Sequence, residues 1–383
     1  MNTVKFLTAT ALLFFVFIHK PPSTDVEWSQ WATLVILGSL LLVRSPLIEN
    51  LPVKLFYLYT AFGSLMWGLW RDWTETLFNK DILIEILQVR MYALIESLET
   101  LVIAIGFLNW KKIRELVAWA LFFGGLLHCC DLIYDQMILQ VTYDQVIHGY
   151  EIGLMGNRSI GATFAAMWVF FALEWMRNFD WKFAKFFPIA AFIGVVGVCC
   201  SNSGISYIGL AAGAIAICVI KKYWRAIGII FTLAGCAYPF VAPRLFMTNM
   251  RYDIWPIWLQ WWYGSWSGVY WTPGHFNPLF GSGGGTARYW GPYGQIKEGF
   301  KTNTLLLFAH NDWLQILLEH GLVGLVLGAW VFGMALKRAW GRPILFGGLV
   351  CFGICAFGNY PLRVAPTALL ALWLFGEAYN EVI

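Results

Sequence analysis

Apolar runs of about 15–20 residues recur along the whole chain, and each is near the length that a helix needs to cross a bilayer. This repetition predicts an all-α, polytopic membrane protein of about twelve spans. The expected spans are 4–19, 28–43, 55–70, 91–109, 115–130, 160–176, 186–200, 204–220, 226–241, 317–336, 343–358 and 364–379.

The composition supports a membrane protein. Of 383 residues, 59% are hydrophobic and 13% charged, whereas a soluble domain would carry roughly twice that charged share. The 22 tryptophans suit the aromatic belts that form at membrane–water interfaces. The first run resembles a signal peptide in length, but no small-residue cleavage site follows it, so we expect a retained span.

Basic residues predict the orientation of the spans, because cytoplasmic connections are enriched in lysine and arginine. Such residues gather in alternate connections, which puts both termini in the cytoplasm. They are Arg44, Lys54, Lys111, Lys112, Arg114, Arg177, Lys182, Lys185, Lys221, Lys222, Arg225, Lys337, Arg338 and Arg342. The long hydrophilic connection 242–316 is then expected on the outer side.

Four basic residues are expected at one membrane level on this outer side: Arg158, Arg251, His310 and Arg363. The arginines suit phosphate groups, either of a substrate or of ordinary lipids, and the sequence leaves both open. Seven tryptophans between 255 and 290 suit either an interfacial belt or stacking on sugar rings.

His310 stands directly before an apolar helix. Asp312 and Gln315 resemble a capping box, and Gly321 is placed to end the helix. The positive end of a helix dipole disfavours a protonated imidazole, so we expect His310 to be a neutral base, active above roughly pH 6. A histidine that only helps to cap the helix is the alternative. A metal site is not expected, because no second His or Cys follows at helical spacing.

Four landmarks in order resemble the O-antigen ligase and Wzy-type O-antigen polymerase family, membrane glycosyltransferases of the GT-C class. They are Arg251 with Trp255; Pro278-Leu279 with Gly281 and Gly283; His310-Asn311 with Leu314-Gln315; and Gly321-Leu322 with Gly324. The resemblance covers about residues 150–380 and suggests two parts, N-terminal helices in 1–150 and a ligase/polymerase-like domain in 151–383. One departure is "SNSG" at 201–204, where many members carry an arginine.

The resemblance implies a metal-independent, inverting glycosyltransferase without a cofactor. It would move a glycan from undecaprenyl pyrophosphate to an acceptor hydroxyl on the periplasmic face of a bacterial inner membrane. His310 would be the general base, Arg158, Arg251 and Arg363 would bind the pyrophosphate, and Asn311, Asp312 and Trp255 would support them. Expected partners are the lipid-linked donor, the bilayer and a hydroxyl of a glycan, lipid A-core or protein, but no nucleic acid.

Two other functions remain open at the sequence level. One is a flippase for the same lipid-linked glycan, for which midplane polar residues and an internal repeat would be expected. The other is a protein that only interacts with partners in the membrane. Ligase, polymerase and protein O-oligosaccharyltransferase activities are not distinguished, because motifs do not encode the acceptor.

Overall fold

The computed structural model describes Tyr59 and residues 110–139, 158–179, 184–201, 203–230, 254–260, 262, 278–281 and 309–380. Every element of regular structure in these ranges is a helix, which confirms the all-α fold class for this part of the chain. Apart from Tyr59, the first four predicted spans lie outside the described residues, as does most of the predicted 242–316 connection.

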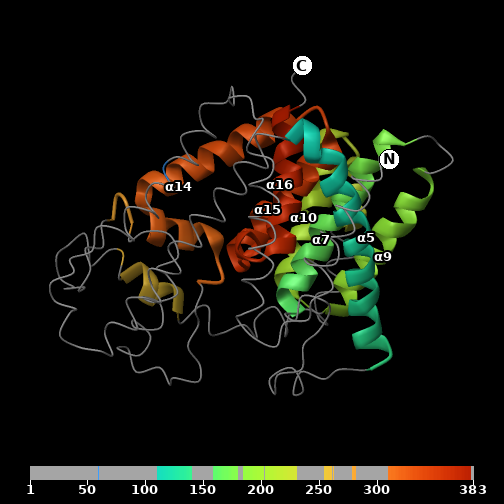
Figure 1. The fold of residues 1–383 in the computed structure, drawn as a ribbon, viewed down its shortest axis with the longest axis horizontal. Coiled ribbons are helices and arrows are strands. Elements are labelled where there is room, and N and C mark those ends of the chain that lie inside the picture. The colour runs from blue at the N-terminus through green and yellow to red at the C-terminus, as the bar shows by residue number, and fades with distance from the viewer. Residues whose placement is uncertain are drawn as a thin grey trace. The chain divides into compact units, whose positions relative to one another are not determined.

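Five of the helices begin and end within two residues of their predicted apolar runs, whereas the two longest extend beyond theirs. The helices are α5 (Trp110–Met137), α7 (Arg158–Trp175), α9 (Phe186–Ser201), α10 (Gly204–Ile220), α14 (Asp312–Ala339), α15 (Pro343–Gly358) and α16 (Ala365–Asn380), with short 3-10 turns η1 (Met176–Asn178) and η3 (Pro361–Arg363) (Figure 1). In the part of the chain that the structure describes, three stretches are long and apolar enough to cross a membrane: Arg114–Met137, Ser159–Asn178 and Asp312–Ala339.

The chain forms two compact units, each described here by itself. Unit 1 contains residues 1–41, 109–247 and 334–383, and unit 2 contains residues 42–108 and 248–333. Helices α5, α7, α9, α10, α15 and α16 belong to unit 1. Most of α14 belongs to unit 2.

Helix α7 is the central helix of unit 1 and packs against α5, α9, α10, α15 and α16. Its middle is almost wholly apolar, and the described side chains from Ala162 to Ala172 are buried. The one indole in this stretch, Trp168, donates its Nε1–H to the carbonyl of Leu121 in α5 at 2.8 Å. Burial of a large side chain stabilises a fold by about 1.5–3 kcal/mol, so these buried side chains contribute substantially to the stability of unit 1.

Five charged side chains form an ion-pair cluster at the C-terminal end of α7. Arg177 contacts Glu174, three residues earlier, at 2.7 Å. The guanidinium of Arg342 contacts Glu174 at 2.9 Å and Glu377 at 3.2 Å. Arg114 contacts the other oxygen of Glu377 at 2.5 Å. Both glutamates are only 1% exposed, so their charges depend on these arginines. The cluster joins α5, α7 and α16 to the residue before α15.

Candidate functional site

Helix α14 changes direction at Gly321, the glycine predicted to end a helix. Its φ of 65° and ψ of −169° are not helical, and the helix resumes at the next residue. The ring centroids of Trp313 and Phe332 lie 5.5 Å apart, whereas a straight helix would separate these positions by about 28 Å. The second part of α14 therefore folds back beside the first. We call residues 312–320 the half-helix.

The fold at Gly321 also limits the longest straight stretch of α14. From residue 322 to residue 339 the helix is about 27 Å long, close to the roughly 30 Å thickness of a bilayer core. The half-helix is thus an appendage to a span rather than part of it. The predicted span 317–336 lies within the candidate span Asp312–Ala339, and the backbone turns at Gly321, four residues after the predicted start.

A turn at residues 278–281 is docked into the break in α14. The N–H of Leu322 donates to the carbonyl of Pro278, and the N–H of Val323 donates to the carbonyl of Leu279, both at 3.0 Å. The first amides of a helix have no partner within it. The turn therefore supplies the acceptors that the second part of α14 requires.

Two glycines make this close approach possible. Gly281 and Gly321 both have positive φ, 81° and 65°. A Cβ on Gly281 would lie 2.2 Å from the carbonyl oxygen of Glu319, and a Cβ on Gly321 would lie 2.3 Å from the carbonyl of Leu279. Neither position can accept a side chain without moving the backbone. Gly281 and Gly321, which belong to separate motifs in the sequence, thus lie on the two sides of one backbone contact.

A short helix at residues 254–260, followed by Trp262, is bonded near both ends of the half-helix. The indole N–H of Trp255 donates to the carbonyl of Ala309, directly before His310, at 2.7 Å. The indole N–H of Trp262 donates to the carbonyl of Pro278, in the turn docked at the break, at 3.1 Å. Buried indoles usually find such an acceptor. Trp255, predicted to support the site, thus holds the residue preceding the candidate base.

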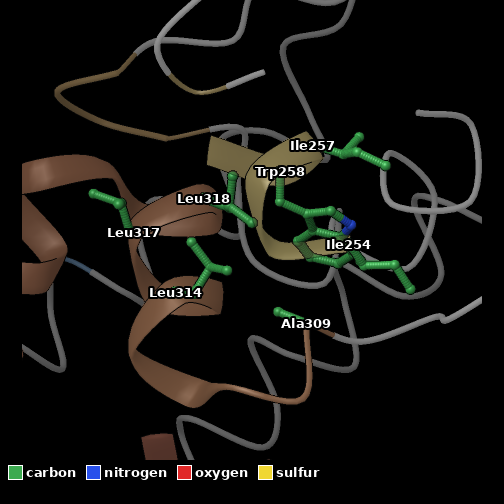
Figure 2. Close-up of a cluster of buried hydrophobic side chains, with 7 residues drawn as sticks. All are labelled: Ile254, Ile257, Trp258, Ala309, Leu314, Leu317 and Leu318. Carbon is green, nitrogen blue, oxygen red and sulfur yellow. The ribbon is translucent and has the colours of Figure 1, made fainter. Parts of the chain in front are cut away.

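A buried apolar cluster fills the space between the half-helix and the short helix. Figure 2 shows Leu314 and Leu318 of the half-helix pointing toward Trp258 and Ile254. The cluster also contains Ile257, Ala309 and Leu317. Positions 314, 317 and 318 recur at helical spacing, so one face of the half-helix is fixed by apolar packing.

His310 lies at the start of this half-helix in an unusual backbone conformation. Its φ is 50°, in the left-handed region that non-glycine residues seldom adopt. Its Nδ1 atom is buried, while the residue as a whole is partly exposed. Backbone strain of this kind costs about 1–3 kcal/mol and is concentrated at functional sites. The strained backbone therefore lies directly before the half-helix, at the predicted base.

Asn311, not Asp312, is the N-cap of the half-helix, so the predicted capping box at Asp312 is wrong. The Oδ1 atom of Asn311 accepts the N–H of Leu314 at 3.0 Å, and its carbonyl accepts the N–H of Gln315 at 2.9 Å. Asp312 is the first helical residue and is buried. A negative charge at this position is stabilised by the helix dipole. The amide of Leu314 is therefore already occupied by the cap.

The half-helix carries a second buried face that sequence reasoning missed as a group. Asp312, Gln315 and Glu319 recur at helical spacing and are at most 2% exposed. The Nε2 of Gln315 donates to Glu319 at 3.2 Å. At the C-terminal end, the hydroxyl of Tyr59 donates to the carbonyl of His320 at 2.9 Å. The presence of acidic and amide residues at helical spacing within an apolar run was the sequence signal that could have predicted this face.

Among the described residues, none of the predicted pyrophosphate-binding arginines lies in the same unit as His310. Arg251 lies outside them. Arg158 is the first residue of α7, and Arg363 is a buried residue of η3; both belong to unit 1, whereas His310 belongs to unit 2. Within unit 1, the side chain of Asn359, four residues before Arg363, donates to Ser159, which follows Arg158, at 3.1 Å.

Within the described residues, no group of three or more His, Cys, Asp or Glu side chains is arranged to hold a metal ion. No protein-family model matches this chain, and no curated protein matches its sequence.

Proposed function

We propose that this chain is a membrane glycosyltransferase that moves a glycan from undecaprenyl pyrophosphate to an acceptor hydroxyl. The observation that carries the proposal is His310, which is fixed in a left-handed conformation at the start of a half-helix. The half-helix is held near both ends by Trp255 and Trp262. The ordered motifs that resemble the O-antigen ligase and polymerase family are the second support.

The proposed reaction transfers one proton to a base and releases one leaving group. His310 removes the proton from the acceptor hydroxyl as the oxygen attacks the anomeric carbon of the donor sugar, with inversion. The bond from that carbon to the pyrophosphate oxygen breaks, and undecaprenyl pyrophosphate leaves. Arginine guanidinium groups balance the charge that develops on the pyrophosphate. In this proposal those groups come from Arg158, Arg251 and Arg363.

Fixed geometry is what such a base requires. A reacting group held in place avoids the entropic cost of orientation, and small misplacements lower the rate strongly. The strained backbone at His310, the cap at Asn311 and the indole bond to Ala309 all restrict one short segment. The N–H of Leu314 is capped by Asn311, so this cap bond does not depend on His310.

The proposed cellular setting is a bacterial inner membrane crossed by about twelve spans, with the site on the periplasmic face. Three apolar stretches of sufficient length and the alternation of basic residues support this topology. A membrane-embedded enzyme also has direct access to a polyprenyl-linked donor.

The direct test is transfer by the purified protein in EDTA, with an undecaprenyl-pyrophosphate-linked glycan as donor. Acceptors would be lipid A-core, a second lipid-linked glycan and a hydroxyl-bearing protein, in separate reactions. The expected result is release of undecaprenyl pyrophosphate with one of the three acceptors, which also identifies the type of transferase. No release with any of them would exclude the proposal.

A flippase for the same lipid-linked glycan is the second candidate. The observation that favours it is the break at Gly321 beside buried Glu319 and His320, because broken helices with buried polar residues line the substrate sites of many transporters. The two functions differ in whether the bond between the glycan and the pyrophosphate is broken. In proteoliposomes a flippase would move the donor across the bilayer and leave its glycan attached.

A further inference from the structure

Five polar side chains close a ring of hydrogen bonds at the N-terminal end of α7. Its members are Ser159, Thr163, Ser203, Ser206 and Asn359. Around the ring, Ser159 Oγ lies 3.3 Å from Ser203 Oγ, which is 3.0 Å from Ser206 Oγ. Ser206 Oγ lies 3.3 Å from Thr163 Oγ1. The Nδ2 of Asn359 closes the ring by donating to Thr163 at 3.0 Å and to Ser159 at 3.1 Å. We call this set the polar ring.

The polar ring joins three segments that are far apart in the sequence. Ser159 and Thr163 belong to the first two turns of α7, Ser203 and Ser206 lie at the start of α10, and Asn359 directly follows α15. Asn359 is fully buried and uses both amide hydrogens inside the ring, one to each α7 hydroxyl. It is therefore the side chain that ties the end of α15 to α7.

Two arginines flank the points at which Asn359 makes these bonds. Arg158 immediately precedes Ser159, and Arg363 closes η3, which begins two residues after Asn359. Arginine is seldom buried as deeply as Arg363, which is 5% exposed. The hydroxyl of Thr367 lies 2.6 Å from the carbonyl of Pro361 and holds η3 from its other side. The backbone that carries both arginines is thus fixed by buried polar contacts.

Packing alone does not require such a ring. Each hydrogen bond adds about 1 kcal/mol net, and apolar side chains of similar size would hold three helix ends about as well. Hydrogen-bonded polar networks do fix one arrangement more sharply than apolar packing. In the ring both amide hydrogens of Asn359 are used, although its buried Oδ1 atom has no partner among the described residues. Bidentate binding of a phosphate depends on such a fixed arrangement, because the guanidinium fork must meet two oxygens at once.

We propose that Asn359 is a positioning residue that, through the polar ring, sets Arg363 to bind the pyrophosphate of a polyprenyl donor. This assignment rests on the proposed function for its ligand. Asn359 does not touch the ligand; it orients the backbone that carries Arg363.

The test is a double-mutant cycle on the binding of farnesyl pyrophosphate to the full-length protein in detergent, measured by calorimetry. Asn359→Ala is expected to raise the Kd about tenfold in the wild-type background. In an Arg363→Gln background the same change should raise it less than about twofold, because the effect passes through the arginine. An equal increase in both backgrounds, or none, would overturn the proposal.

Two serine variants control for general damage to this end of unit 1. Ser201 and Ser206 are both fully buried, but the hydroxyl of Ser201 donates to Val198 of its own helix and is not in the polar ring. Ser206→Ala should raise the Kd about threefold and Ser201→Ala should leave it unchanged. If Asn359→Ala does not fold, this pair carries the test, and equal effects of the two substitutions would refute the proposal.

Measurements of binding and of transfer distinguish the proposed function from the positioning role of Asn359. Wild-type protein that binds farnesyl pyrophosphate with the expected coupling, but transfers no glycan, would remove the proposed function and leave the role of Asn359 intact. Wild-type protein that transfers glycan but shows no coupling between Asn359 and Arg363 would leave the function and remove the positioning role. Wild-type protein that does not bind the probe would overturn the positioning role directly.

Discussion

Unit 1 and unit 2 hold their helices in different ways. In unit 1, side chains contact side chains at the two ends of α7, through the polar ring at one end and the ion-pair cluster at the other. In unit 2, the contacts around the half-helix involve the backbone itself, as acceptor of indole and hydroxyl groups and in bonds to the 278–281 turn. The contacts of unit 1 fix the ends of several helices to one another, whereas those of unit 2 fix the backbone of one short segment directly. A positioned catalytic base requires the second kind of support.

The largest expected effect on stability comes from the backbone contact in unit 2. Gly321→Ala places a Cβ 2.3 Å from the carbonyl of Leu279 at a position with positive φ. Strain and overpacking together predict a loss of about 4 kcal/mol, with loss of transfer activity. Thermal denaturation in detergent measures this.

The matched control lies in the same helix. Gly333 has no neighbour within 4 Å of an added Cβ, so Gly333→Ala should be neutral or stabilising by up to about 1 kcal/mol. Equal stability of the Gly321→Ala and Gly333→Ala proteins would show that the turn at 278–281 is not docked in the break.

The next effect concerns the ion-pair cluster of unit 1. Glu377→Gln removes a buried charge that Arg342 and Arg114 both contact, and leaves those guanidinium groups partly unpaired. We expect a loss of about 3 kcal/mol, at the lower end for a broken buried pair because Arg114 is partly exposed. Lys337 is exposed and lies five residues before Arg342. Lys337→Ala should change stability by less than about 0.5 kcal/mol. Equal, small effects would mean that the cluster contributes no more than a surface pair.

A smaller effect separates stability from activity. Trp255→Phe and Trp262→Phe each remove one indole hydrogen bond to a carbonyl, for a loss of about 1 kcal/mol. Only Trp255 holds the residue before His310, so its variant should lose clearly more transfer rate at equal loss of stability. Rates and melting temperatures of the two variants would be compared directly. Equal rates would mean that the Trp255 bond does not help to place the base.

The smallest expected effect is at the cap. Asn311→Ala removes the acceptor for the N–H of Leu314 and should cost about 1 kcal/mol. Asn311→Asp keeps the acceptor and should restore that stability. Because the predicted cap was Asp312, Asp312→Asn serves as the comparison and should leave the cap bond unchanged. A larger loss from Asp312→Asn than from Asn311→Ala would contradict the assignment of the cap.

The sequence predicted the parts of this molecule that depend on local pattern. Helix α15 occupies its predicted range, because an apolar run begins at a proline and ends beside Asn359. Gly321 was recognised as a helix end. The cap was assigned one residue too late, because Asn311 and Asp312 are both good N-cap residues and only the backbone distinguishes them.

Contacts between distant segments were not predictable from one sequence. Glu174 and Arg342 each look like an ordinary charged residue near a helix end, and only the fold brings them to 2.9 Å. The half-helix was not predicted as a separate helix, for a different reason. Asp312, Gln315 and Glu319 interrupt its hydropathy, although they are buried in the structure. The docking of the 278–281 turn depends on two glycines that separately resemble ordinary turn residues.

The central claim is that His310 is the base of a glycan transfer. Single-turnover transfer by His310→Ala, with donor binding measured on the same sample, tests it most directly. The account predicts that the rate falls by about 10²–10⁴-fold while the donor Kd and the melting temperature stay close to wild type. EDTA should change neither rate. A His310→Ala protein that transfers glycan at a near-normal rate would contradict the claim and leave His310 as a structural residue beside the cap.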